Sequence, residues 1–440
     1  MEEPSDEDAP DPTAASSGQN EAPAPATPKA APKMKISKLA YVPKEQLSPR
    51  RDKRQRRKRP ARQGKSKAWR LWKVMTCPIV ELVRLMVQIG FFVSFEGTKC
   101  QKCDKNGKLK LIAHTDEIVY YSCDKCEDEP FSFLEASSAH NGWLVKVPLR
   151  KQLAAMWCFA QCLSTELAVL ITALGLTSIN TLFDLCVDKV SAYQEDENEV
   201  MQLGGEFVQC EADEVCFRAT VEKDQADPDN SQITWLRYIA IFVRGQSRFF
   251  LGLLPNRFSA GAGQGGGGAL SIDELIEVLE PESDRPRLKW RSILHTDSAK
   301  AYKKVGPQRW PEPGAHHDSF EGLEVFKKLE YTHTNVTHKR KVGQQTQYAA
   351  VREVILPNGE KRQVKGGTQT TDGYWATLRR EVGRKGFNTG GSADDPKRHR
   401  LHRLVRAHQW SFWNLGDDRF ALLGEVFRAQ REVENAKAFF

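Results

Sequence analysis

Residues 207–219 read FVQCEADEVCFRA, an apolar run that holds Asp213 near its centre. Two more apolar runs follow it, ITWLRYIAIFV at 233–243 and SRFFLGLL at 247–254. Runs of this length and composition predict three strands, the last two turned at Arg244–Gln246. A charged side chain inside an apolar strand is costly to bury without a partner, and a divalent metal ion is one such partner.

Two further aspartates stand at the edges of predicted elements. Asp297 follows a short predicted strand at Ser292–His295, and Asp372 lies near the start of a helix predicted at 371–382. Taken singly, each is more often a turn or cap residue than a ligand. Together with Asp213, they supply the carboxylates that Mg²⁺ or Mn²⁺ prefers, in a layout suited to two-metal phosphodiester chemistry.

The segments around these acids predict further strands and helices. Residues 259–268 form a Gly-rich loop, and a helix is expected to begin at the cap Ser271. The Pro-Asn-Gly sequence predicts a hairpin at Val351–Val364. The fold class is therefore α+β or α/β, in a chain long enough for several domains.

Four cysteines form the most specific local pattern. They make two CxxC pairs separated by nineteen residues, namely Cys100, Cys103, Cys123 and Cys126. This spacing is typical of a structural, tetrahedral four-cysteine Zn²⁺ site, with a hairpin between the pairs that returns at Ile118–Ser122. The other interpretation is four reduced cysteines in a core. The acidic, Pro/Ala-rich start lacks the features of a secretory signal, so we expect a reducing compartment.

Helices are expected on both sides of the cysteines. Residues 68–92 have the apolar periodicity of an amphipathic helix with Pro78 near its first turn, followed by a short strand at Phe91–Phe95. Residues 149–193 have the rhythm of a helix–turn–helix with its turn at Gly175–Leu176, or of a plain helical bundle. Polar breaks in the apolar stretch 153–185 favour helices of a soluble protein over a membrane span.

Charge is concentrated in the first part of the chain. The net charge is +8. Residues 1–45 are rich in Ala, Pro, Ser and acids, which predicts disorder, whereas 50–67 hold eleven Lys or Arg and one acid. The basic block is either a solvated linker or a signal read by a nuclear import receptor, which would place the protein in the nucleus. The candidate import residues are Arg50, Arg51, Lys53, Arg54, Arg56, Arg57, Lys58 and Arg59.

The three acids lie in motifs that resemble those of the DDE transposases of the ISXO type. Asp213-Glu214 before Phe217 resembles the first motif, and His295-Thr296-Asp297 with Tyr302 resembles the second. The later motifs are similar to Val336-Thr337-His338, to TQTTDGYW at 368–375 and to Trp410-Ser-Phe412-Trp413-Asn414. A zinc ribbon, a helix–turn–helix-like region and a catalytic core follow one another in this family, the order found here over residues 76–414.

The resemblance implies an RNase H-like core, a mixed β-sheet flanked by helices. This core would cleave double-stranded DNA at element ends and join a 3′-hydroxyl to target DNA. Asp213, Asp297 and Asp372 would bind catalytic Mg²⁺ or Mn²⁺, with auxiliary roles for Glu214, His338 and Gln369. The protein would act on DNA as a homo-oligomer. Basic clusters near the motifs would contact phosphates; these are Lys339, Arg340, Lys341, Arg379, Arg380, Arg384 and Lys385.

The expected organisation has five parts: a disordered acidic then basic tail (1–67), a helix with the zinc ribbon (68–147), a helical region (148–200), the catalytic domain (201–415) and a C-terminal helix (416–440). Two departures from the family stand out. Asp372 occupies the position of a usual Glu, and Gln369 stands where a nearby Asn would be. The alternatives are therefore a domesticated, catalytically impaired nuclear DNA-binding protein, or an RNase H-like nuclease without joining activity.

Overall fold

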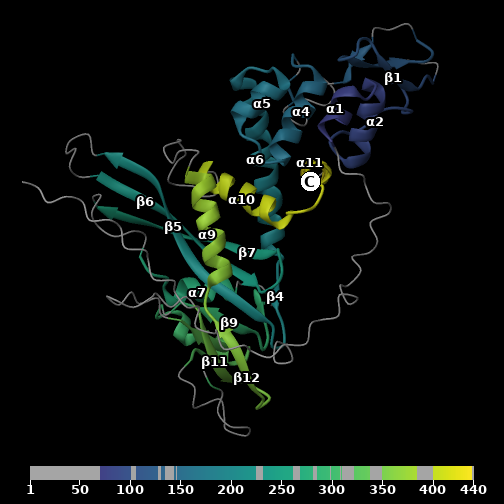
Figure 1. Ribbon diagram of the computed structural model, residues 1–440. Helices are drawn as coiled ribbons and strands as arrows, with labels where there is room; N and C mark the ends of the chain where they lie inside the picture. Colours follow the sequence, from purple (N-terminus) through teal and green to yellow (C-terminus); the bar gives the residue numbers. More distant parts are fainter. Residues whose placement is uncertain are drawn as a thin grey trace, which may run out of the picture. The chain divides into compact units, whose positions relative to one another are not determined.

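The strands expected around Asp213 form the middle and one edge of a five-stranded sheet in this computed structural model (Figure 1). The strand order is β10-β9-β5-β6-β7, with β5, β6 and β7 antiparallel and β9 and β10 parallel to β5. The strands are β5 (Gln209–Lys223), β6 (Ser231–Val243), β7 (Phe249–Ala260), β9 (Ile293–Thr296) and β10 (Thr332–Asn335). The fold is thus mixed α+β, as the sequence predicts.

The structure describes residues 70–438 apart from several internal gaps. The gaps are 101–105, 127–129, 134–142, 145, 224–230, 261–267, 281–284, 298, 308, 310–321, 337–348 and 384–399. The described residues belong to one unit of the chain, Ser66–Phe440. The expectations for the N-terminal tail and most of the Gly-rich loop therefore lie outside the described residues.

Alternation along the strands gives the sheet two apolar faces. On one face, Cys210 and Ala212 of β5 share a core with α7, the 3₁₀ turn η2 and α8. On the other face, Val215 and Phe217 share a core with α9 and α10, and Figure 1 shows α9 lying across the sheet. The covering elements are α7 (Ile272–Leu279), η2 (Tyr302–Lys304), α8 (Glu324–Lys327), α9 (Gln369–Gly383) and α10 (Arg400–Trp413).

Two local signals are confirmed, one for α7 and one for a hairpin. Ser271 caps α7 in a capping box, since its side chain accepts from the backbone N–H of Glu274 while the Glu274 carboxylate accepts from the N–H of Ser271. The Pro-Asn-Gly hairpin is present as the antiparallel pair β11 (Ala350–Ile355) and β12 (Lys361–Gly366). Another small sheet pairs β4 (Leu203–Gly204) with β8 (Leu288–Lys289).

The first helical segment differs from the prediction. Two helices replace the single one, α1 (Leu71–Thr76) and α2 (Ile79–Ile89), with a break at Cys77–Pro78. Cys77 is extended (φ −61°, ψ 138°) because the ring of a following proline disfavours the helical conformation. The expected strand at Phe91–Phe95 is absent from this described stretch, where Phe91 and Phe92 instead pack against Trp143.

A further core joins the start of the described chain to its end. It contains residues of α2, of the small sheet β1-β2-β3, of the helical region and of the C-terminal helix. Gly424 lies so close to α2 that a β-carbon there would stand 2.6 Å from the carbonyl oxygen of Ile89. These elements are β1 (Leu109–Ala113), β2 (Val119–Cys123), β3 (Phe131–Ser132), α4 (Leu149–Ala160), α5 (Thr165–Thr172), α6 (Leu176–Glu199) and α11 (Arg419–Ala438).

Candidate functional site

The three candidate acids come from three adjoining elements. Asp213 lies on β5 with the same parity as Val215 and Phe217, so it faces the side of the sheet that α9 covers. Asp297 directly follows β9, the parallel neighbour of β5. Asp372 lies in the first turn of α9. The fold therefore brings together residues that are 159 positions apart in the sequence.

Electrostatics shows that the carboxylates interact. Burial, followed by the negative charges of Glu214, Asp297 and Asp372, raises the pKa of Asp213 to about 8. Like charges in a half-buried site disfavour full ionisation, so such a site binds a proton or a cation. Groups with strongly perturbed pKa values are enriched at functional sites, although structural networks also perturb them.

The site is more open than one ion with three carboxylate ligands would require. Within the described part of the chain, the only three potential metal ligands whose atoms all lie within 4.8 Å of one another are thiols. The carboxylates of Asp297 and Asp372 also have local contacts. The N–H of Ala299 donates to Asp297 Oδ1 at 2.9 Å, and Thr368 Oγ1 donates to Asp372 Oδ2 at 3.2 Å. Such contacts are those of turn and cap residues, the other interpretation of these acids.

Glu214 points to the face of the sheet opposite Asp213. It has the parity of Ala212, and the hydroxyl of Tyr302 donates to its Oε2 at 2.8 Å. Burial raises the pKa of Glu214, while the Tyr302 hydrogen bond acts in the lowering direction. Two neighbouring acids of one motif therefore serve different sides of the sheet, and Tyr302, the second motif's tyrosine, belongs to the side of Glu214.

The histidine of the His-Thr-Asp motif is buried and neutral. Burial, and to a smaller extent the charge of Arg244, holds the pKa of His295 well below its usual 6.5. Its Nε2 lies 3.1 Å from Gln209 Oε1, and its Nδ1 lies 2.6 Å from Thr334 Oγ1. Because Gln209 Oε1 can only accept, the proton is assigned to Nε2. His295 thus ties β9 to both of its neighbouring strands.

Sequence reasoning missed two residues beside the acids, Glu211 and Arg244. Glu211 is 3% exposed and accepts from the N–H groups of Thr370 (2.7 Å) and Thr371 (3.3 Å) at the start of α9. Arg244 Nε donates to Glu211 Oε1 at 2.7 Å. The acidic sequence around Asp213 offered a signal for Glu211, but its partners lie 33 and 159 or more positions away.

Other predicted site residues fall on the surface or outside the described residues. Gln369 begins α9 and is exposed, and Arg379 and Arg380 are exposed further along the same helix. The structure does not describe His338 or the basic residues Lys339, Arg340, Lys341, Arg384 and Lys385. Two of the seven candidate DNA-binding residues can therefore be located, and both lie on the helix that carries Asp372.

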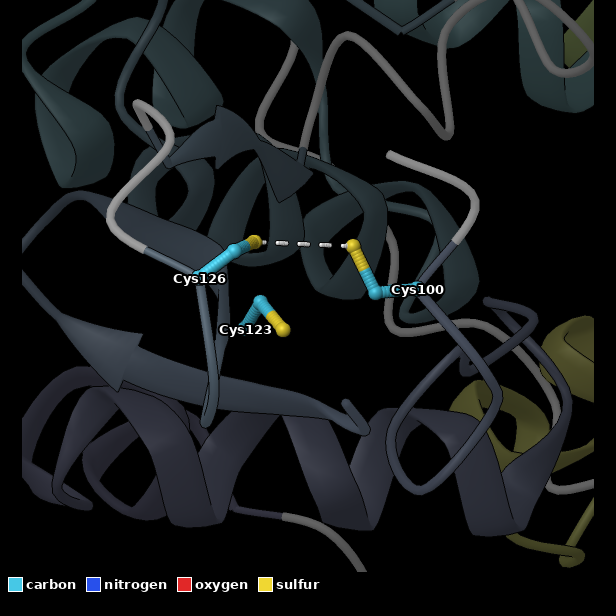
Figure 2. Close-up of side chains that lie close together, drawn as sticks. All are labelled: Cys100, Cys123 and Cys126. Atoms are coloured by element: carbon cyan, nitrogen blue, oxygen red, sulfur yellow. Dashed lines mark hydrogen bonds between the residues drawn. The ribbon is translucent and has the colours of Figure 1, made fainter. Parts of the chain in front are cut away.

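Three of the four paired cysteines form a second candidate site. Figure 2 shows Cys100, Cys123 and Cys126 gathered together, and their sulfur atoms all lie within 4.8 Å of one another. The Cys100 and Cys126 sulfurs are 3.9 Å apart. Cys123 ends β2, the expected returning strand, whereas Cys103 lies outside the described residues. A backbone N–H from Lys125 is the main cause that lowers the pKa of Cys123 to about 7, which favours the thiolate form that binds metals.

Helices α5 and α6 of the helical region meet at a sharp bend, and aspartates of α6 form ion pairs with α10. The axes of α5 and α6 differ by 117°. Asp184 and Asp188 of α6 pair with Arg400 and Arg403 of α10. Among the described helices, none alone is long and apolar enough to cross a membrane, and only this bent pair satisfies length and composition when the two helices are combined.

Comparisons with protein-family models, with curated proteins and with solved structures found no match to this chain.

Proposed function

We propose that this protein is a DDE-type transposase that uses divalent metal ions to cleave DNA and to join a 3′-hydroxyl to target DNA. One observation carries the proposal. The charges of Asp297 and Asp372 both act on Asp213, so the acids of three separate motifs share one electrostatic environment. Their motifs resemble those of the ISXO-type family and follow one another in the same order.

The chemistry of the donor set fits Mg²⁺ or Mn²⁺. The carboxylates of Asp213, Asp297 and Asp372 would hold the ions, which when bound activate the attacking oxygen and stabilise the leaving oxygen. Hard carboxylate oxygens are the ligands such ions prefer. A cation would offset the burial and the repulsion that together raise the pKa of Asp213. The chain's own part is to hold the three acids on β5, after β9 and on α9.

The sheet supports the proposal of an RNase H-like core. Its five strands are mixed, and the candidate acids lie on the central strand and at the end of the strand parallel to it. Helix α9 covers the face to which Asp213 points. This arrangement agrees with the fold that the resemblance implies.

A zinc ribbon is the proposed interpretation of the cysteine site. Two sulfurs bound to the same tetrahedral Zn²⁺, each at about 2.3 Å, lie about 3.8 Å apart. The Cys100–Cys126 separation of 3.9 Å is close to this value. Four thiolates would leave no position for water, so this Zn²⁺ would be structural, and Cys103 would supply the fourth ligand.

Double-stranded DNA is the proposed partner, bound by the protein as a homo-oligomer in the nucleus. Arg379 and Arg380 are exposed on α9, the helix that carries Asp372. Cations near the reacting phosphates would give affinity without reading base sequence. The proposed import signal at residues 50–59 would bring the protein to its substrate.

A second candidate is a domesticated DNA-binding protein without catalytic activity. The favouring observation is that the carboxylates are spread more widely than the clustered thiols, with a shorter Asp372 in place of a usual Glu. This protein would bind DNA tightly and cleave none.

The test uses the full-length chain, Mn²⁺, duplexes from the DNA that flanks its gene and a supercoiled plasmid as target. The proposal expects nicked ends and plasmid joining, both lost in Asp213→Asn. Cleavage without joining indicates a nuclease. If the wild type binds DNA without cleaving it, the proposal that the protein is an active enzyme is overturned. If Asp372→Glu then cleaves DNA, the protein has lost an ancestral activity. Full activity of Asp213→Asn shows that the site assignment is wrong.

A further inference from the structure

A single arginine contacts two of the three segments that carry the candidate acids, and one of its partners contacts the third. Arg244 lies at the turn between β6 and β7, and its side chain is 23% exposed. Nε donates to Glu211 Oε1 at 2.7 Å, and Nη1 donates to Gln209 Oε1 at 2.9 Å. Both acceptors belong to β5, the strand of Asp213.

The same guanidinium reaches the segment that leads into α9. Nη2 donates to the carbonyl oxygen of Gly367 at 2.9 Å, and Nη1 also donates to that of Lys365. Thr368, the next residue, accepts from the N–H of Asp372 and donates its hydroxyl to the carboxylate of Asp372. Arg244 therefore fixes the backbone just before the third acid.

Glu211 completes the connection from the side of β5. Its carboxylate accepts hydrogen bonds from the backbone N–H groups of Thr370 and Thr371, and from the Thr370 hydroxyl at 3.1 Å. A carboxylate at a helix N-terminus is favoured by the unpaired N–H groups and the helix dipole. Because Glu211 and Asp213 are two residues apart on one strand face, this contact sets how α9 approaches Asp213.

The network also extends to the second acid. Gln209 Oε1 accepts from Arg244 and from His295, two residues before Asp297. In the β5–β9 register, Glu211 is the direct partner of His295. One connected set of hydrogen bonds therefore links the three segments that carry the acids.

We propose that Arg244 and Glu211 are positioning residues that set the spacing of Asp213, Asp297 and Asp372 for divalent cations. This inference rests on the proposed function of the site. The planar guanidinium presents several N–H donors in a fixed fork, which a lysine ammonium cannot reproduce. Arg244→Lys keeps the charge and loses the geometry, whereas Glu211→Gln keeps the shape and loses the charge.

The experiment measures Mn²⁺ binding to the zinc-loaded, full-length chain by titration calorimetry, and hydrogen exchange of the first turn of α9 without Mn²⁺. Both variants should raise the Mn²⁺ dissociation constant about 10- to 100-fold, the usual effect of losing an outer-shell partner, and accelerate exchange at residues 370–373. The double variant should be little worse than either single one, because the two residues act as one unit.

Glu195→Gln is the matched control, because it breaks another Glu–Arg pair, with Arg406 (2.6 Å), between α6 and α10. It should leave Mn²⁺ affinity unchanged. The inference would be overturned if Arg244→Lys, Glu211→Gln and Glu195→Gln all lost Mn²⁺ affinity equally, or if Arg244→Lys kept the wild-type affinity. It would also be overturned if Mn²⁺ binding weakened while hydrogen exchange in the first turn of α9 stayed unchanged. If Asp213→Asn abolishes binding while Arg244→Lys does not, the proposed function survives without this inference. A wild type that binds no Mn²⁺ overturns both.

Discussion

Replacing Asp213 by asparagine should stabilise the metal-free protein at pH 7, although most changes within a sheet destabilise it. Burial, then Glu214, Asp297 and Asp372, raise the pKa of Asp213 from 3.8 to about 8. A carboxyl with a raised pKa binds its proton more tightly in the folded than in the unfolded chain. The free energy of unfolding therefore falls as the pH rises through this interval.

The size of the effect follows from the width of that interval. Between the ordinary pKa and pH 7 lie about 3 pH units, each worth about 1.4 kcal/mol, so the limit is about 4 kcal/mol. Solvent reaches part of the side chain, and we expect a gain of about 2 to 3 kcal/mol for Asp213→Asn. At pH 5 the gain should shrink to about 1 kcal/mol or less, because ionisation then costs less.

Urea unfolding of zinc-loaded protein in buffer free of Mg²⁺ and Mn²⁺ measures this, at pH 5 and at pH 7. Asp116→Asn, a change at an exposed position between β1 and β2, is the control and should have little effect at either pH. Added Mn²⁺ should stabilise the wild type and leave Asp213→Asn unchanged. The reasoning is refuted if Asp213→Asn is no more stable than the wild type at pH 7, or if the difference does not depend on pH.

Three further predictions concern stability and metal content. Burial opposes ionisation of Glu195, but His402 and Arg406 lower its pKa to about 2, so Glu195→Gln should cost about 2 kcal/mol at pH 7 in urea unfolding. That cost should disappear as the pH falls from about 4.5 to 2; a cost that persists contradicts the ion pair. Cys126→Ser should lower bound Zn²⁺, about one per chain in the wild type by elemental analysis, and reduce Tm. Gly424→Ala should destabilise by about 1 to 3 kcal/mol through a clash with Ile89, whereas Gly373→Ala, with open space around it, should not; equal effects would exclude the close contact.

The parts of the fold that the sequence predicts are those with local signals. The apolar runs around Asp213 predict β5, β6 and β7 because strand composition and a polar turn are both readable over a few residues. The capping box at Ser271 and the Pro-Asn-Gly turn fix α7 and the β11–β12 hairpin for the same reason. The break at Pro78 also had a local cause, and the apolar periodicity across it concealed the break.

Contacts between distant segments were beyond sequence reasoning. The approach of Gly424 to Ile89 joins two helices more than 330 positions apart, and nothing near either residue indicates its partner. Among the candidate site residues, Glu214 is expected to face the side of the sheet opposite Asp213 as soon as the segment is predicted to be a strand, because neighbouring residues of a strand alternate sides. The role of Glu211 cannot be predicted in this way, because its donors come from Arg244 and from the start of α9.

The most direct test of the central claim, that Asp213, Asp297 and Asp372 form one cation site, is anomalous diffraction from crystals of the zinc-loaded protein grown with Mn²⁺. Data on both sides of the manganese absorption edge distinguish Mn²⁺ from the Zn²⁺ expected at the cysteines. The account predicts manganese peaks bounded by these three carboxylates, and their loss in Asp213→Asn. Manganese bound only elsewhere, or a wild-type site without manganese at millimolar Mn²⁺, would contradict it.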